Sequence, residues 1–188
     1  YTEVGFSCLN KAGEQLCGDS VECRVDDSGA LVTLADGLGS GVKASILSTL
    51  TAKILTTMLA GGMSIDCCVE TVAKALPICK ERGIAYSTFT IIRIIDNRRA
   101  ELIQFDNPRV ALFRNGKNLD YPVSTREICG KRILESSFPV EEGDVLFAMS
   151  DGAICAGTGL ALNHGWTRDS IIEFIEAAYA PDHSAQYY

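Results

Sequence analysis

The residues of this chain best suited to chemistry lie in two aspartate-glycine turns, Asp36-Gly37 and Asp151-Gly152. Each turn follows a short apolar run typical of a buried strand, residues 30–34 in the first case and 145–149 in the second. A carboxylate at a strand end can be aimed at a hard cation, and the glycine after it lets the backbone turn sharply and expose its carbonyl. Both turns are therefore candidates for a metal site.

A third turn, Gly18-Asp19-Ser20, comes just before another strand-like run. Asp-Gly is among the commonest turn dipeptides, so a single pair more often marks a plain turn than a site. The repetition in dissimilar surroundings favours a shared site, and so does the long helical pattern that follows Asp36 directly. Three Asp residues at strand ends, distant in sequence, predict a site for Mg²⁺ or Mn²⁺, because both ions prefer oxygen ligands.

Composition narrows the class of protein. The 188 residues suit one domain, and 47% hydrophobic with 22% charged residues is typical of a globular protein. A net charge of −7, with no Lys/Arg cluster larger than a pair, argues against a nucleic-acid partner. No apolar run reaches the roughly 18 residues of a membrane span. The eight cysteines show no Cys-x-x-Cys spacing, which predicts reduced core thiols in a cytoplasmic protein.

Strand-like and helical patterns along the chain must position the three turns. Strands are predicted at residues 2–9, 20–26, 30–36, 87–95, 99–105 and 109–114, with a last strand that ends at Asp151. Helices are predicted at 41–60, from Ser64 toward residue 83 with a kink or early end near Pro77, and at 167–179. The first helix has an apolar row that we expect to be its buried face, Ile46, Leu50, Ile54 and Met58. Helices grouped between runs of antiparallel-looking strands indicate an α+β fold.

Taken in order, four motifs resemble the PP2C-type metal-dependent protein phosphatases, in their bacterial SpoIIE-like branch. The motifs are Gly18-Asp19-Ser20, Asp36-Gly37-Leu38-Gly39-Ser40-Gly41, Tyr86-Ser87-Thr88-Phe89-Thr90 and Ser150-Asp151-Gly152. Each is weak alone, but together they are fairly specific and extend over nearly the whole chain. The resemblance implies an α-β-β-α sandwich, in which two antiparallel sheets are flanked by helices, with residues 1–188 forming a single domain.

The resemblance also implies roles for the site residues. Asp36 would bridge two metal ions, and the Gly37 carbonyl would be a further ligand. Asp151 would bind one ion directly, and Asp19 would contribute to the other directly or through water, so that Asp36 and Asp151 are the catalytic residues. The ions would be Mn²⁺ or Mg²⁺. The implied activity is hydrolysis of phosphoserine or phosphothreonine in a protein by metal-activated water, which requires no side-chain nucleophile.

Two further expectations follow from the resemblance. The family carries another metal-binding Asp in a C-terminal Asp-Asp-x-Thr strand, and this chain ends at Tyr188 before such a segment, so we expect the domain to be C-terminally incomplete. The implied substrate is a phosphorylated anti-anti-sigma-type regulator, and the assignment also admits a homodimer. The alternative is a catalytically weak PP2C-like module that serves as a regulatory or protein-binding domain.

Overall fold

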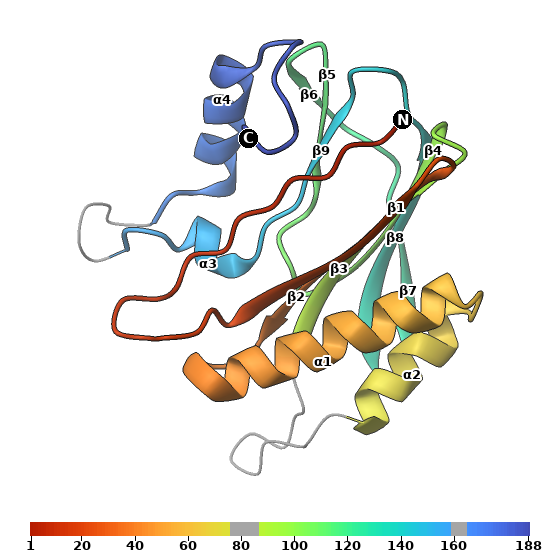
Figure 1. Ribbon diagram of the computed structural model, residues 1–188, viewed down its shortest axis with the longest axis vertical. Coiled ribbons are helices and arrows are strands. Elements are labelled where there is room, and N and C mark those ends of the chain that lie inside the picture. Colours follow the sequence, from red (N-terminus) through yellow and green to blue (C-terminus); the bar gives the residue numbers. More distant parts are fainter. Residues whose placement is uncertain (76–86, 159–164) are drawn as a thin grey trace.

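Alternating apolar residues place most strands of the chain in one six-stranded antiparallel sheet (Figure 1). The computed structural model describes residues 1–75, 87–158 and 165–188. The order of strands in this sheet is β1 (Asp19–Asp26), β2 (Gly29–Gly37), β3 (Ser87–Ile95), β4 (Arg99–Phe105), β8 (Lys131–Pro139) and β7 (Ser124–Ile128). A second antiparallel sheet has the order β6 (Lys117–Leu119), β5 (Ala111–Arg114) and β9 (Val145–Phe147).

The helices cover the outer faces of the two sheets (Figure 1). Helices α1 (Gly41–Ala60) and α2 (Ile65–Ala75) pack on the large sheet, and α4 (Arg168–Ala178) packs beyond the small one. A single short turn, α3 (Asp151–Ile154), follows β9. Apolar clusters fill the spaces between helices and large sheet, between the two sheets, and between small sheet and α4. The α+β fold with two antiparallel sheets flanked by helices is thus confirmed.

The face that α1 buries differs in part from the predicted one: of the predicted row, Ile54 and Met58 are partly buried against the core cluster. Ile46 and Leu50 are 53% and 44% exposed. The buried face instead carries mostly small residues, among them Ala44, Ser48, Thr51 and Ala52. The reason is the short distance between α1 and β2: a Cβ atom placed on Gly37 would lie 2.0 Å from the carbonyl oxygen of Ala44. Only small side chains fit between a helix and a strand that approach so closely.

By length and composition alone, α1 could span a membrane. In the structure, however, apolar residues of this helix pack in the protein core. Leu55 and Ala52 are fully buried in the cluster between α1 and the large sheet, and Thr56 donates a hydrogen bond to Thr33 of β2 at 2.8 Å. The helix therefore forms part of the core.

Most predicted elements are present, with differences at the ends of the chain and near its middle. Residues 2–9 form no strand, whereas β6, β7 and β8 were not predicted. The β7–β8 hairpin turns at Cys129-Gly130, where both residues have positive φ angles of 51° and 72°. Such turns usually carry Asn-Gly or Asp-Gly, so the Cys129-Gly130 pair gives no recognisable turn signal in the sequence. Thr167 caps α4, since its hydroxyl accepts a hydrogen bond from the Ser170 N–H.

Two other expectations have mixed outcomes. The predicted extension of the second helix toward residue 83, with its kink near Pro77, lies outside the described residues. The described cysteines are all free thiols, but the expectation that they belong to the core is wrong for most of them. Cys68 alone among them is buried, whereas five are exposed: Cys8, Cys23, Cys67, Cys129 and Cys155.

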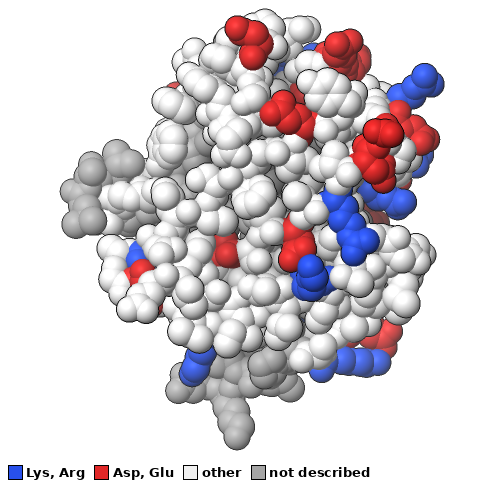
Figure 2. Space-filling view, viewed as in Figure 1, with Lys and Arg blue, Asp and Glu red and all other residues white. Residues whose placement is uncertain are grey.

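Charged side chains lie mainly along one side of the face shown in Figure 2, where Lys and Arg are interleaved with Asp and Glu. Ion pairs also form between oppositely charged side chains of the described residues. Arg114 binds both Asp144 and Glu141, and Arg126 bridges Asp66 and Glu135. Exposed pairs such as Arg126–Asp66 contribute little to stability, whereas Asp144 in the pair with Arg114 is buried. Because opposite charges alternate, this face presents no continuous basic band.

We predict that Gly37→Ala destabilises the protein by roughly 1–3 kcal/mol or more, because the new methyl group would overlap the Ala44 carbonyl. Urea unfolding followed by circular dichroism measures the change. Gly152→Ala is the matched control: its new Cβ would find its nearest neighbour, the Ser150 hydroxyl oxygen, at 3.6 Å, which is ordinary contact. Equal losses of stability in both variants would contradict the close approach of α1 to β2.

Candidate metal centre

Two of the predicted carboxylates are direct neighbours at one end of the large sheet. In the antiparallel register of β1 and β2, Asp19 lies opposite Asp36, and in that of β2 and β3, Asp36 lies opposite Thr88. The Gly37 N–H donates to the Gly18 carbonyl at 3.1 Å, which ties the two turns together. Residues directly opposite each other point to the same face of a sheet. The side chains of Asp19 and Asp36 therefore share the face toward the small sheet.

The third carboxylate reaches this point from the other sheet. β9 of the small sheet leads into Ser150 and Asp151, which start α3. The Ser150 hydroxyl donates a 2.7 Å hydrogen bond to Oδ2 of Asp19, 131 residues away. The carboxyl group of Asp36 makes hydrogen-bonding contacts with those of both Asp151 and Asp19. The structure therefore brings Asp19, Asp36 and Asp151 together, with Gly37 next to them.

The electrostatics of this cluster are unfavourable without a cation. Burial, and then the negative charges of Asp19 and Asp151, raise the pKa of Asp36 to about 8. A carboxyl group flanked by two others keeps its proton because a further negative charge there would be repelled. A divalent cation would remove this repulsion, and the donors are the oxygen ligands that Mg²⁺ and Mn²⁺ prefer. The residues present fit such an ion.

The three aspartates do not surround a common position that a metal ion could occupy. Within residues 1–75, 87–158 and 165–188, no three His, Cys, Asp or Glu side chains are grouped in a way that could hold a metal ion. The three carboxyl groups meet through contacts of Asp36 with each of the others, in the arrangement of a metal-free cluster. Metal ligation by Asp19, Asp36, Gly37 and Asp151 thus stays a prediction.

Several polar residues beside the carboxylates had not been predicted as part of a site. The Ser87 hydroxyl donates to the Asp36 carbonyl at 2.9 Å. Thr88 donates to Oδ1 of Asn107 at 2.5 Å, and the Asn107 amide donates to the Thr90 hydroxyl at 3.2 Å. Ser87 and Thr88 belong to the strand motif of residues 86–90. Only the pairing of β2 with β3 shows that they lie beside Asp36 and Gly37. Asn107 lies in an Asn-Pro turn, and that signal indicates a turn and nothing more.

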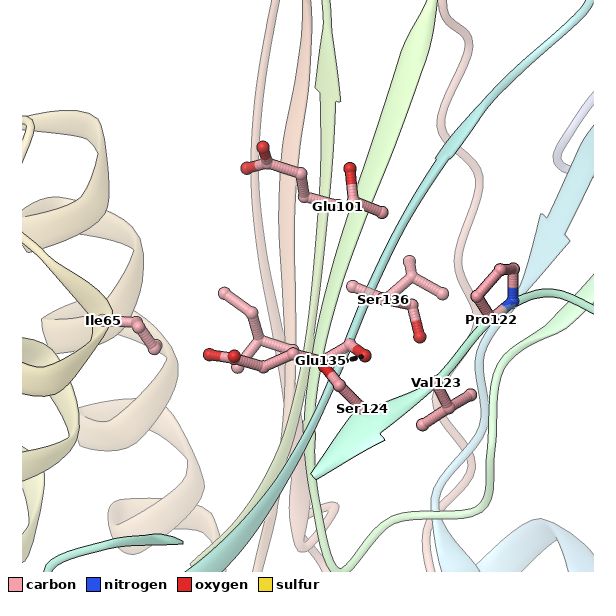
Figure 3. Close-up of a pocket in the computed structure, with 10 residues that line it drawn as sticks. Ile65, Glu101, Pro122, Val123, Ser124, Glu135 and Ser136 are labelled. Carbon is pink, nitrogen blue, oxygen red and sulfur yellow. Dashed lines mark hydrogen bonds between the residues drawn. The ribbon is translucent and has the colours of Figure 1, made fainter. Parts of the chain in front are cut away.

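A separate groove of about 550 Å³ lies away from these carboxylates, where β4 and β8 meet the start of β7 (Figure 3). Ile65 of α2 stands on one side of it, and Pro122 and Val123 stand on the other. Glu135 and Ser136 lie between them. Glu135 already pairs with Arg126, and none of the three aspartates contributes to the lining. The groove is therefore not part of the candidate metal centre.

Comparison with known proteins agrees with the geometry. The family model of stage II sporulation protein E (SpoIIE) matches residues 26–186. No curated protein gives a significant sequence match.

Several solved structures are similar in fold. The PP2C phosphatase domain of Bacillus subtilis SpoIIE, solved with a fragment of its regulatory domain, shares 20% identity at a TM-score of 0.67; the match covers 97% of this chain but only 59% of that one. RsbX in complex with magnesium shares 21% identity at a TM-score of 0.62, over 96% of this chain and 87% of that chain. The RsbU and RsbW domains of a Mycobacterium tuberculosis protein share 16% identity at a TM-score of 0.66, over 90% and 47% of the two chains.

The raised pKa of Asp36 gives a pH dependence with a defined sign. The folded-state pKa of about 8 lies above the usual Asp value of about 3.9, so the folded protein binds more protons than the unfolded chain between these values. The contribution of Asp36 to stability is therefore fully present at low pH and is lost as pH rises through this window.

We predict that Asp36→Asn stabilises the metal-free protein at about pH 9 but hardly at about pH 5, where Asp36 already carries its proton. Thermal unfolding in the presence of a chelator measures the difference between variant and wild type at both pH values. A gain of 1 kcal/mol would raise the melting temperature by roughly 2–4 °C for a chain of this length. The same gain at both pH values would contradict the mutual repulsion of the carboxylates.

Proposed function

Because the chain belongs to the SpoIIE family of PP2C-type phosphatase domains, we propose that it is a metal-dependent protein phosphatase that hydrolyses phosphoserine or phosphothreonine in a regulatory protein. One observation carries the proposal: three aspartates from distant parts of the chain meet at one sheet end and raise the pKa of the central one, Asp36. A carboxylate cluster with a strongly shifted pKa is a frequent mark of a functional site. The fold alone would not be sufficient, because one fold supports many functions.

In this proposal each carboxylate has a distinct role. Asp36, which contacts both of the others, would hold two ions of Mn²⁺ or Mg²⁺, with the Gly37 carbonyl as a further ligand. Asp19 would hold one ion and Asp151 the other. When bound, the ions would acidify a water molecule for attack on phosphorus and offset negative charge on the phosphoryl oxygens.

The other contributions come from the protein itself. The Ser87 hydroxyl fixes the backbone at Asp36, and the bond between Thr88 and Asn107 fixes the strand beside it. In the metal-free protein Asp36 holds a proton near neutral pH, because ionisation would place a third negative charge in the cluster. Cation binding would displace this proton, so that the site becomes fully anionic only when it is loaded.

We further propose the cellular setting. The similarity in fold to the RsbU and RsbW domains supports a phosphorylated anti-anti-sigma-type regulator as the substrate. We propose in addition a cytoplasmic location and a homodimer. The chain spans 59% of the B. subtilis SpoIIE structure, which also contains part of a regulatory domain. Control of activity by other parts of a longer protein is consistent with these proposals.

A second function remains open because of a specific observation. Within the part of the chain that the structure describes, no ready three-residue metal site is present. A PP2C-like module that catalyses weakly and acts by binding another protein would not need a preformed metal site. The two functions differ in a simple way: a phosphatase requires Mn²⁺ or Mg²⁺ for turnover, whereas a binding module does not.

We predict that the protein releases phosphate from a phosphoserine protein in the presence of Mn²⁺ and that Asp36→Asn lowers the rate by at least about 10²–10³-fold. Asp36→Asn would weaken the hold on both ions, and losing the charge stabilisation that such groups supply typically costs this much. Asp27→Asn is the matched control, because Asp27 is an exposed turn residue outside the cluster. Release that is independent of Mn²⁺, or equal in both variants, would contradict the phosphatase; no release at all would favour the binding module.

A further inference from the structure

Ser150 uses its hydroxyl group in an unusual way for its position. It precedes the first residue of α3, where a Ser side chain normally accepts a hydrogen bond from the helix N-terminus. Its side chain makes no such capping bond. Instead the hydroxyl donates to Oδ2 of Asp19 at 2.7 Å, and the residue is only 7% exposed. The Ser150 side chain, which follows the small sheet, is therefore hydrogen-bonded to a carboxylate of the large sheet.

This bond restricts the Asp19 carboxylate. A hydrogen bond to a charged oxygen is short and strong, and it fixes the orientation of the group that accepts it. The Ser150 hydroxyl uses one of the two acceptor sites of Oδ2, whereas it uses none of Oδ1, so binding of a cation through Oδ1 alone is favoured over binding through both oxygens. The backbone holds the same geometry, since Asp19 is the first residue of β1 and is paired there with Asp36. Asp19 is thus set to offer one oxygen rather than two.

The number of oxygens that a carboxylate offers matters for the choice of metal. Mg²⁺ requires near-octahedral coordination and takes one oxygen from each carboxylate, whereas Ca²⁺ accepts 6–8 oxygens and often binds both oxygens of one carboxylate. We propose that Ser150 is a positioning residue that keeps Asp19 a one-oxygen ligand and so favours small divalent cations over Ca²⁺. This inference rests on the metal site of the proposed function.

A purely structural role for Ser150 makes a different prediction. If the bond only tied the Ser150 loop to the large sheet, its loss would weaken the binding of every cation to the same extent. A positioning role instead changes the ratio of affinities, because a freed Asp19 could turn and offer both oxygens to a larger ion. The ratio of Mn²⁺ to Ca²⁺ affinity, and not either affinity alone, therefore separates the two roles.

The test is calorimetric titration of the metal-free purified protein with MnCl₂ and, separately, CaCl₂. For Ser150→Ala we expect Mn²⁺ affinity to fall by about 10–100-fold, the usual effect of losing a partner of a ligand. Ca²⁺ affinity should fall less or rise, so that the ratio changes at least about tenfold. Ser150→Thr keeps the hydroxyl and should restore the wild-type ratio.

A matched control is Thr167→Ala, which removes the hydroxyl that caps α4 and that bonds to Ser170 rather than to any of the three aspartates. It should lower the melting temperature and leave the ratio unchanged. A parallel fall of both affinities in Ser150→Ala, or an unchanged ratio, would overturn the inference while leaving the proposed metal site in place. A wild-type protein that binds no Mn²⁺ would overturn the metal site and the inference with it.

Discussion

The mutual repulsion of three carboxyl groups is the constraint on which the rest of this structure depends. Asp19, Asp36 and Asp151 come from separate turns, and folding brings them into contact. Within the described part of the chain, none of the three forms an ion pair with a basic side chain. Such a cluster costs free energy unless protons or cations relieve it. Burial and the two neighbouring carboxylates raise the pKa of Asp36 to about 8, which favours its protonated form near neutral pH. The same repulsion is what would make the site a strong binder of divalent ions.

The architecture explains how an unfavourable cluster can be held. Two carboxylates lie at adjacent positions of one sheet, where the register between β1 and β2 leaves them little freedom. The third comes from the small sheet, so the distance between sheets decides how closely it approaches. On the opposite face of the large sheet, α1 lies directly over Gly37, and its small residues allow the close packing that holds the end of β2 in place. The packing of α1 therefore supports the site from one face of the large sheet. On the other face, the hydrogen bond from Ser150 to Asp19 links the site to the small sheet.

Much of the fold and the acidic part of the site could be predicted from local patterns. Asp-Gly turns after apolar runs located Asp36 and Asp151, a turn before a strand-like run located Asp19, and strand-like runs located β2, β3 and β4. The buried face of α1 could not be predicted from its apolar row, because close approach to Gly37 selects small residues over large ones. The β7–β8 hairpin was missed because Cys129 stands where Asn is usual. The role of Ser150 depends on a contact across 131 residues, which no local pattern contains.

The central claim is that Asp36 carries a proton that a divalent cation displaces. The most direct test is calorimetric titration of the metal-free protein with Mn²⁺ near pH 7, repeated in buffers that differ in ionisation enthalpy, because this counts the protons released on binding. We expect release of about one proton per protein near pH 7, decreasing as pH rises past the Asp36 pKa of about 8, and none in Asp36→Asn. Binding of Mn²⁺ with no proton release near pH 7, or with equal release in the variant, would contradict it.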